Sequence, residues 1–190
     1  TAVTVDTILG GISTELSGTG VSHTIIGNGI YLYSDNAFSV EVIDQDLMRV
    51  MQEQVNDVSE LPTQCKDGYI VKVANSRDSN QDDLWLKFEG NDGKDGTGSW
   101  VECPKPGIVK ELNATTMPHV LQRQTNGNFL VKKYTWETRQ VGDDVTNPLP
   151  SFADGSSKIN KVLFFRNRLA LLSGENVILS RPGELATPSF

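Results

Sequence analysis

The sequence predicts a mainly β protein of the α+β class, built chiefly from antiparallel strands. Short segments in which apolar and polar residues alternate recur along the chain, for example at residues 69–74 and 84–89. Turn-forming residues separate these segments, and glycine is frequent, with 17 residues among 190. The clearest helical pattern lies at the start of the chain. Because alternation places the apolar side chains on one face of each strand, the segments suit antiparallel sheets with one buried face.

The helical pattern occupies residues 4–17. Its apolar residues recur at helical spacing and are Val5, Ile8, Leu9, Ile12 and Leu16. Thr4 is a suitable N-cap, and Gly18 is suited to end the helix. Gly10 and Gly11 each weaken a helix by about 1 kcal/mol relative to alanine. We therefore expect this helix to dock on a neighbouring element.

A β-hairpin and a further strand are expected after the helix. Residues 24–26 and 30–33 flank Gly27-Asn28-Gly29, and an Asn-Gly pair accepts the positive φ angles of a type I′ turn. Residues 38–43 are predicted to form the next strand. In residues 46–58 the apolar positions fit a helical stripe, which favours a helix on periodicity alone.

Two changes in composition divide the chain into three predicted domains. Leu61-Pro62 marks the first boundary, so residues 1–60 form an acidic domain of helix, hairpin and strand. Residues 61–142 form an antiparallel meander. Residues 142–158 are rich in Gly, Asp, Asn, Pro and Ser and are expected to be a linker or an ordered loop. The third domain, residues 143–190, contains this segment and the strands that follow it.

Further strands are expected in the second and third domains. One lies at residues 99–103, and a hairpin joins residues 120–124 to 128–138 across Asn126-Gly127. The last three predicted strands are at residues 161–166, 168–172 and 177–180. We expect a chain that ends at Asp143 to stay folded and to lose any self-association, because the meander closes its own hairpins.

The charge is unevenly distributed along the chain. The net charge is −7. Residues 1–60 contain nine acidic residues and one arginine and so carry −8, whereas the remaining residues contain fifteen acidic and sixteen basic residues and carry +1. Such an acidic first third cannot bind a nucleic-acid backbone by counterion release. It is either a solvated acidic surface or a wall that DNA passes without sticking.

No motif indicates a catalytic site. The two histidines, His23 and His119, have neither the HxH nor the HExxH spacing of metal sites. A nucleophilic triad needs a base beside a nucleophile and a carboxylate, and the GxSxG pattern is absent around Ser173. We therefore expect that the chain is not an enzyme and that it has no catalytic residue.

Metal and cofactor sites are not expected either. Residues 91–96 resemble a calcium-binding loop, but glycine occupies the third ligand position and no glutamate closes the loop, so a hairpin turn is favoured. In the same loop Lys94 precedes an aspartate, which a phosphate-binding loop does not tolerate. The pairs Asp82-Asp83 and Asp143-Asp144 are poor chelates, because neighbouring strand residues point to opposite faces. The two cysteines, Cys65 and Cys103, are expected to be reduced core residues.

Two residue sets leave alternatives open. The basic residues near the C-terminus are Lys158, Lys161, Arg166, Arg168 and Arg181. They either contact nucleic acid or, as we favour for the arginines, pair within a packed sheet. The tryptophans are Trp85, Trp100 and Trp136; they either stack on sugars or, as we favour, pack in the core.

Residues 61–181 resemble the tail tubular protein B family, the nozzle proteins of short-tailed bacteriophages. The matching segments are residues 61–62 (LP), 67–72 (DGYIVK), 116–119 (TMPH), 126–129 (NGNF), 142–148 (GDDVTNP), 150–152 (PSF), 159–162 (INKV), 164–169 (FFRNRL), 172–176 (LSGEN) and 179–181 (LSR). The resemblance implies that residues 46–58 are extended rather than helical. It also implies that the last strands begin a β-propeller-like blade.

The resemblance further implies a structural role in the virion tail, in a protein assembled in the bacterial host cytoplasm. Nozzle proteins form a hexameric tube below the tail adaptor ring and conduct the genome into the host. The expected partners are therefore copies of the same protein, the adaptor ring and the tail fibre proteins, while DNA passes without specific binding.

The alternative is a host-surface carbohydrate-binding or depolymerase-like tail module. Both ends of the sequence are expected to be cuts in a longer protein. No signal peptide and no membrane-spanning run is found in the sequence.

Overall fold

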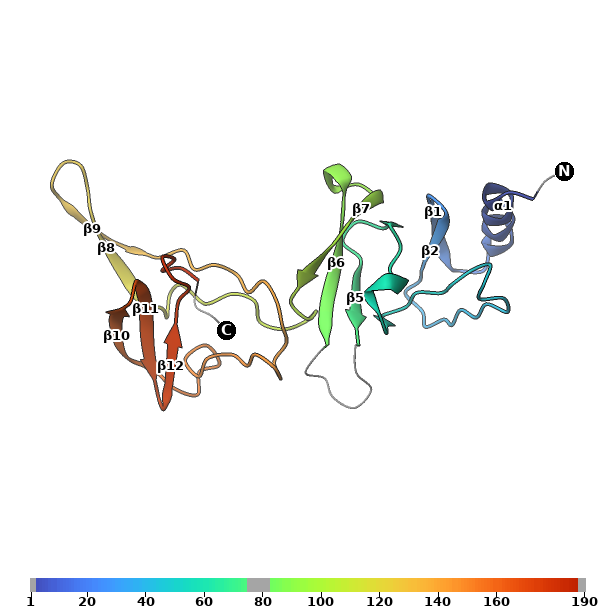
Figure 1. Cartoon of the computed structure of the whole chain (residues 1–190). Helices are drawn as coiled ribbons and strands as arrows, with labels where there is room; N and C mark the ends of the chain where they lie inside the picture. Colours follow the sequence, from blue (N-terminus) through green and yellow to red (C-terminus); the bar gives the residue numbers. More distant parts are fainter. Residues whose placement is uncertain (1–2, 75–82, 188–190) are drawn as a thin grey trace. The chain divides into compact units, whose positions relative to one another are not determined.

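The structure of the chain, a computed structural model, describes residues 3–74 and 83–187. The chain divides by its contacts into two compact units, Thr1–Cys103 (unit 1) and Pro104–Phe190 (unit 2). The described residues contain one α-helix and twelve strands (Figure 1), so the predicted β-rich α+β class is confirmed. No helix within these residues is long and apolar enough to cross a membrane.

The predicted N-terminal helix is present as α1 (Val5–Leu16). Thr4 is its N-cap, and the Thr4 hydroxyl accepts a hydrogen bond from the Thr7 backbone N–H at 3.3 Å. At the other end the Ser17 N–H reaches the Thr14 carbonyl at 3.2 Å, and Gly18 has a φ of +87°. Leu9 is the fully buried side chain of the helix, which fits the expectation that the helix docks on a neighbour.

The predicted hairpin is also present, with its turn displaced by one residue. Strands β1 (Ser22–Ile26) and β2 (Gly29–Tyr33) pair antiparallel, with Ile26 opposite Gly29, so the two-residue turn is Gly27-Asn28. Only Gly27 has a positive φ, +53°, which is the pattern of a type II′ turn and not of the predicted type I′ turn. The Gln64 side chain explains the difference. Its Oε1 accepts from the Asn28 N–H at 3.2 Å, and a Cβ on Gly27 would lie 1.7 Å from that oxygen.

Two predictions for the next segment are wrong. Residues 38–43 form no strand, and Ile43 is fully exposed. Residues 46–58 are not a helix but are largely extended, as the family resemblance implied; they include β3 (Gln54–Val55), and a 3₁₀ turn (Val58–Glu60) follows. Polar side chains favour turns over a helix here, because Asp44 and Asp57 each accept backbone N–H groups two residues further along.

Unit 1 is centred on a five-stranded sheet of order β3-β5-β6-β7-β4. The four strands after β3 are β4 (Gln64–Cys65), β5 (Ile70–Val73), β6 (Leu84–Gly90) and β7 (Gly96–Cys103). All pairings are antiparallel except that of β3 with β5. The predicted alternation is confirmed, since the core is formed by Val55, Val71, Val73 and Leu86 on one face.

A chain of aromatic rings joins the first hairpin to this sheet. Tyr31 lies between Tyr33, at 5.7 Å between ring centroids, and Tyr69, at 5.9 Å. Tyr69 then contacts Trp100 edge-on at 6.5 Å, and Trp100 contacts the fully buried Phe88 at 5.2 Å. Aromatic pairs at such distances stabilise a fold beyond the area that they bury. These ring contacts therefore help to hold the β1–β2 hairpin against the five-stranded sheet.

Unit 2 contains a hairpin and a three-stranded sheet. The hairpin is formed by β8 (His119–Arg123) and β9 (Phe129–Lys133), and the sheet by β10 (Ile159–Phe165), β11 (Arg168–Ser173) and β12 (Asn176–Leu179). The β8–β9 turn at Asn126-Gly127 was predicted, but this hairpin forms a two-stranded ladder of its own and does not continue the sheet of unit 1. The predicted single meander is therefore divided between the two units.

The core of unit 2 is small. Leu112, Met117 and Leu171 are buried together, and Trp136 and Phe152 are among the side chains that pack against them. Residues from both sides of the predicted boundary at 142/143 thus share one core.

Candidate assembly surfaces

The two histidines lie in different surroundings. His23 is on β1, and its Nε2 is 2.7 Å from the Ser13 hydroxyl on α1, a contact that the sequence analysis missed. No carboxylate of the described residues hydrogen-bonds His23, so this hydroxyl–imidazole pair lacks the third member of a triad. The pair instead ties α1 to the hairpin. His119 is exposed at the start of β8, opposite Lys133.

The carboxylates around the β6–β7 turn accept hydrogen bonds from backbone N–H groups of the protein. Asp95 accepts from the Asp67 N–H at 2.9 Å and lies 3.6 Å from the Lys66 ammonium. Asp67 in turn accepts from the Gly90 N–H at 2.9 Å. Within residues 3–74 and 83–187, no group of three or more His, Cys, Asp or Glu side chains is placed to hold a metal ion. The turn is therefore built as a structural element.

The carboxylates of Asp143 and Asp144 in unit 2 likewise bind different groups of the protein. The Asp143 carboxylate accepts the Val145 and Thr146 N–H groups at 2.9 and 2.8 Å, and these bonds, chiefly that of Thr146, hold the pKa of Asp143 below its usual value. Asp144 faces Arg139 instead, at 3.5 Å. Of the predicted pair Asp82-Asp83, Asp82 lies outside the described residues.

Arg139 organises the loop around this pair, a role that no sequence pattern indicated. Its side chain is completely buried. The guanidinium donates to the backbone carbonyls of Val141, Asp143 and Asn147, the first at 3.0 Å and the last at 2.6 Å. The segment predicted to be a linker or an ordered loop is thus ordered at its start by the side chains of Arg139 and Asp143.

The tryptophans are only partly buried. Trp100 packs on the core of unit 1, and its indole N–H donates to the Pro62 carbonyl at 2.8 Å. Trp136 packs on the core of unit 2, with its ring 5.6 Å from that of Tyr134. Trp85 is half-buried on the opposite face of β6 from Leu86. Two of the three are therefore core side chains, as favoured above.

The cysteines are buried and form no disulfide. Burial raises the pKa of the Cys65 thiol, which is consistent with a core residue.

The C-terminal basic residues do not pair as expected. None of the five forms an ion pair with another residue of the described chain. Arg166 is not a strand residue but lies in the β10–β11 turn, with a φ of +46°, and its guanidinium lies 5.4 Å from the centre of the Phe165 ring. Asn167 has a φ of +60°, so this turn is the type I′ kind.

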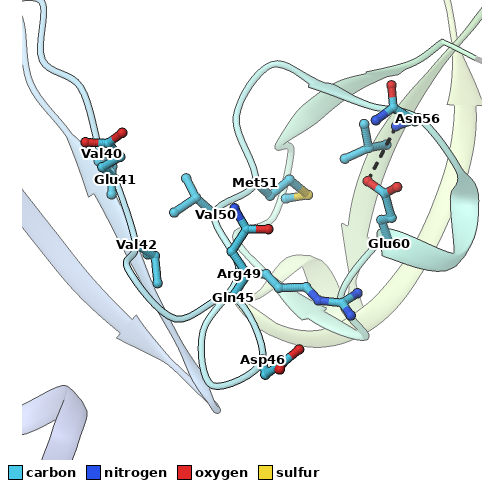
Figure 2. Close-up of a pocket in the computed structure, with 11 residues that line it drawn as sticks. Val40, Glu41, Val42, Gln45, Asp46, Arg49, Val50, Met51, Asn56 and Glu60 are labelled. Carbon is cyan, nitrogen blue, oxygen red and sulfur yellow. Dashed lines mark hydrogen bonds between the residues drawn. The ribbon is translucent and has the colours of Figure 1, made fainter.

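An acidic cleft lies in residues 40–60 of unit 1. It has a volume of about 650 Å³ and is lined by Val40, Glu41, Val42, Gln45, Asp46, Arg49, Val50, Met51, Val55, Asn56 and Glu60. Figure 2 shows the apolar Val42, Val50 and Met51 among the acidic side chains. Three carboxylates and one arginine line this acidic cleft, and Arg49 makes no ion pair with a described residue.

The β8–β9 hairpin has the opposite charge and is exposed along its length. One of its faces carries the cross-strand pairs Leu121–Val131 and Arg123–Phe129, with His119–Lys133 beyond them. Leu121, Phe129 and Val131 are each more than 60% exposed, at 65%, 63% and 66%. Residues 112–136 contain two lysines, one arginine and no acidic residue. We call β8–β9 the basic hairpin.

The three-stranded sheet of unit 2 also exposes apolar side chains. β11 is buried, but Leu163 and Phe165 on β10 and Val177 on β12 are exposed and lie on the face opposite Leu171. A monomeric protein seldom exposes so many large apolar residues close together. Such surfaces are typical of subunits in an assembly.

Comparison with known proteins identifies the family to which the chain belongs. A family model described as bacteriophage nozzle protein matches residues 1–187. Tail tubular protein gp12 of Escherichia phage T7 is 36% identical over 135 residues, which are 71% of this chain and 16% of the phage T7 protein. This chain therefore spans only a small part of that relative. The chain belongs to the bacteriophage nozzle protein family and is a structural component of a phage tail, as its sequence resemblance indicated.

Proposed function

We propose that this chain forms part of the wall of a tail nozzle through which the phage genome is ejected. In the full-length protein six copies form a ring, which contacts the tail adaptor ring and the tail fibre proteins. The protein assembles in the bacterial host cytoplasm, and strands β10–β12 begin a propeller-like blade. The chain itself is not an enzyme.

The uneven charge is the observation that carries the proposal. Nine acidic residues and one arginine in residues 1–60 repel phosphate, while the rest of the chain is nearly neutral. A conduit needs a wall to which DNA does not adhere, since each phosphate contact would slow the passing genome.

The exposed apolar surfaces support an assembled state. The apolar residues on β10, β12 and the basic hairpin have no cover within the described chain, and subunit contacts are the usual cover for such residues. The Ser13–His23 pair supports a structural role for these residues, because no described carboxylate orients the imidazole.

Purification of the full-length protein that contains this chain tests the proposal. Electron microscopy should reveal sixfold rings, and a labelled DNA duplex in about 0.15 M salt should show no submicromolar binding in fluorescence anisotropy. The variant Glu15→Lys/Asp35→Lys reverses two exposed charges of unit 1 and should raise the DNA affinity, most clearly at low salt. Tight duplex binding by the unaltered protein, or the absence of rings, would refute the proposed role.

A further inference from the structure

We propose that the basic hairpin of one copy of this chain binds the acidic cleft of a second copy. The inference rests on the proposed nozzle role and names two surfaces that join neighbouring subunits. It follows from the chemistry of the two surfaces and from their positions in different units.

The basic hairpin offers an apolar centre with positive ends. Leu121, Val131 and Phe129 lie on one face, with Arg123 opposite Phe129 and Lys133 two residues beyond Val131. These three apolar side chains are mostly exposed, and exposed apolar groups gain free energy when a partner covers them. The hairpin has only its own two strands as a sheet, and such a ladder is marginally stable in water unless it packs on something.

The acidic cleft is complementary in both respects. Its apolar side chains are Val40, Val42, Val50, Met51 and Val55, and its carboxylates are Glu41, Asp46 and Glu60. Glu41 and Asp46 are exposed and accept no side-chain hydrogen bond or ion pair within the described residues, so both remain able to pair with an incoming cation. Charges of opposite sign around an apolar centre give an interface both its register and its association rate.

The partner that we infer is a second copy. The hairpin belongs to unit 2 and the cleft to unit 1, so their contact between copies is heterologous, with different patches on the two sides. Heterologous contacts repeat from subunit to subunit and close into rings when the rotation permits. Duplex DNA is the less favoured ligand, because phosphate contacts make no use of Leu121 and Val131.

Charge reversal on each surface tests the contact in the 190-residue chain. Variant H is Arg123→Glu/Lys133→Glu, and variant C is Glu41→Lys/Asp46→Lys. Self-association is measured by sedimentation velocity from about 1 to 100 µM, in about 0.05 M and 0.5 M salt. We expect the unaltered chain to associate, more strongly at low salt, and variants H and C alone to associate at least tenfold more weakly.

Mixing the two variants is the decisive measurement. In the mixture the reversed hairpin of H meets the reversed cleft of C, and the native hairpin of C meets the native cleft of H, so association should return to near its original strength. The matched controls Lys94→Glu/Lys158→Glu and Glu15→Lys/Asp35→Lys change the same numbers of charges at exposed positions elsewhere and should leave association unchanged. Circular dichroism and thermal melts establish that every variant is folded.

Four results would overturn the inference. They are an unaltered chain that stays monomeric, variants that associate as well as the unaltered chain, weakened variants that mixing does not restore, and duplex DNA binding that variant H abolishes. Rings formed by the full-length protein despite any of these results would leave the nozzle role intact and refute only the assignment of the two surfaces.

Discussion

The two units of this chain differ in how far the apolar side chains of their sheets are buried. In unit 1 the core residues of the five-stranded sheet lie on one face and pack with Leu61 and Trp100, while the other face mixes Lys72 and Lys87 with the half-buried Trp85. In unit 2 Leu171 packs in a small core, but Phe164 on the same face and Leu163 and Phe165 on the other face are exposed. The sheet of unit 1 therefore has one well-packed face, whereas the sheet of unit 2 exposes large apolar side chains on both faces.

The loops differ as well. In unit 1 the turns are fixed by short carboxylate contacts such as that of Asp67 with the Gly90 N–H. In unit 2 a long segment without strands is held by the buried guanidinium of Arg139 together with the turn carboxylates of Asp143 and Asp154. Both units thus use carboxylates to fix turns, and unit 2 adds one guanidinium that joins three carbonyls of the same loop.

Truncation gives the largest expected effect. A chain that ends at Cys103 should unfold in one cooperative transition close to that of unit 1 in the whole chain, because all residues of its core precede the cut. A chain that ends at Asp143 should gain no second transition, since Leu112 and Met117 lose Leu171. The expectation that this longer chain stays folded then applies to its unit 1 alone.

Calorimetry and binding of a hydrophobic dye to both truncated chains test this comparison. The longer chain should bind more dye, because Leu112, Met117 and Trp136 become exposed. A second cooperative transition in the chain ending at Asp143 would mean that residues 104–143 fold without the three-stranded sheet, and the contrast between the units would fail.

Removal of the Arg139 side chain gives the next largest effect. Arg139→Ala leaves the buried carbonyl of residue 143 and the part-buried carbonyls of residues 141 and 147 without their donor and should destabilise unit 2 by about 3 kcal/mol. Arg139→Lys should also destabilise unit 2, but by less than Arg139→Ala, since an ammonium can donate to some of these carbonyls but lacks the planar fork of a guanidinium. The exposed Lys158→Ala is the control, with a change under about 0.5 kcal/mol. Equal denaturation midpoints for Arg139→Ala and Lys158→Ala would show that the loop does not depend on Arg139.

The smallest expected effect is a pH dependence in unit 1. The Tyr69 hydroxyl donates to the Gln52 carbonyl at 3.0 Å, and burial raises the pKa of Tyr69 to about 12, above its ordinary value of 10.0. Because the folded-state pKa is the higher one, the stability contributed by the neutral phenol is complete below about pH 10 and is lost as the pH rises towards 12. The stability difference between the unaltered chain and Tyr69→Phe should therefore be constant from neutral pH to about 9 and shrink above 10. Parallel curves for the two proteins in chemical denaturation would contradict this.

The sequence predicted the elements whose pattern is local. The alternation of Val71 and Val73, the cap at Thr4 and the turn at Asn126-Gly127 each depend on a few neighbouring residues, and each is found in the structure. Residues 38–43 have the composition of a strand, but a strand needs a partner, and the periodicity of a single segment cannot supply one.

The contacts that the sequence did not reveal are those between distant residues. Periodicity favoured a helix in residues 46–58, whereas the parallel pairing of Val55 with Val73 decided for an extended chain. Gln64 moved the first hairpin turn by one residue, and Ser13 met His23 only because α1 lies against β1. The acidic character of residues 1–60 was visible as a charge imbalance, whereas the basic hairpin was not singled out from the sequence. The apolar centres of both surfaces became apparent only once the exposed side chains were placed.

The way in which Arg139 is bound also determines which substitutions its loop tolerates. Three of its hydrogen bonds go to main-chain carbonyls, which every residue type possesses, so the side chains of Val141 and Asn147 contribute nothing to those bonds. The loop can thus change the side chains on its outer surface while keeping its path. The same freedom does not extend to Arg139 or to Gly142, because Gly142 has a φ of +84° and a Cβ at this position would lie 3.3 Å from the guanidinium. Substitutions at residues 141 and 147 should therefore preserve the path of the loop, whereas substitutions at Arg139 and Gly142 should disturb it.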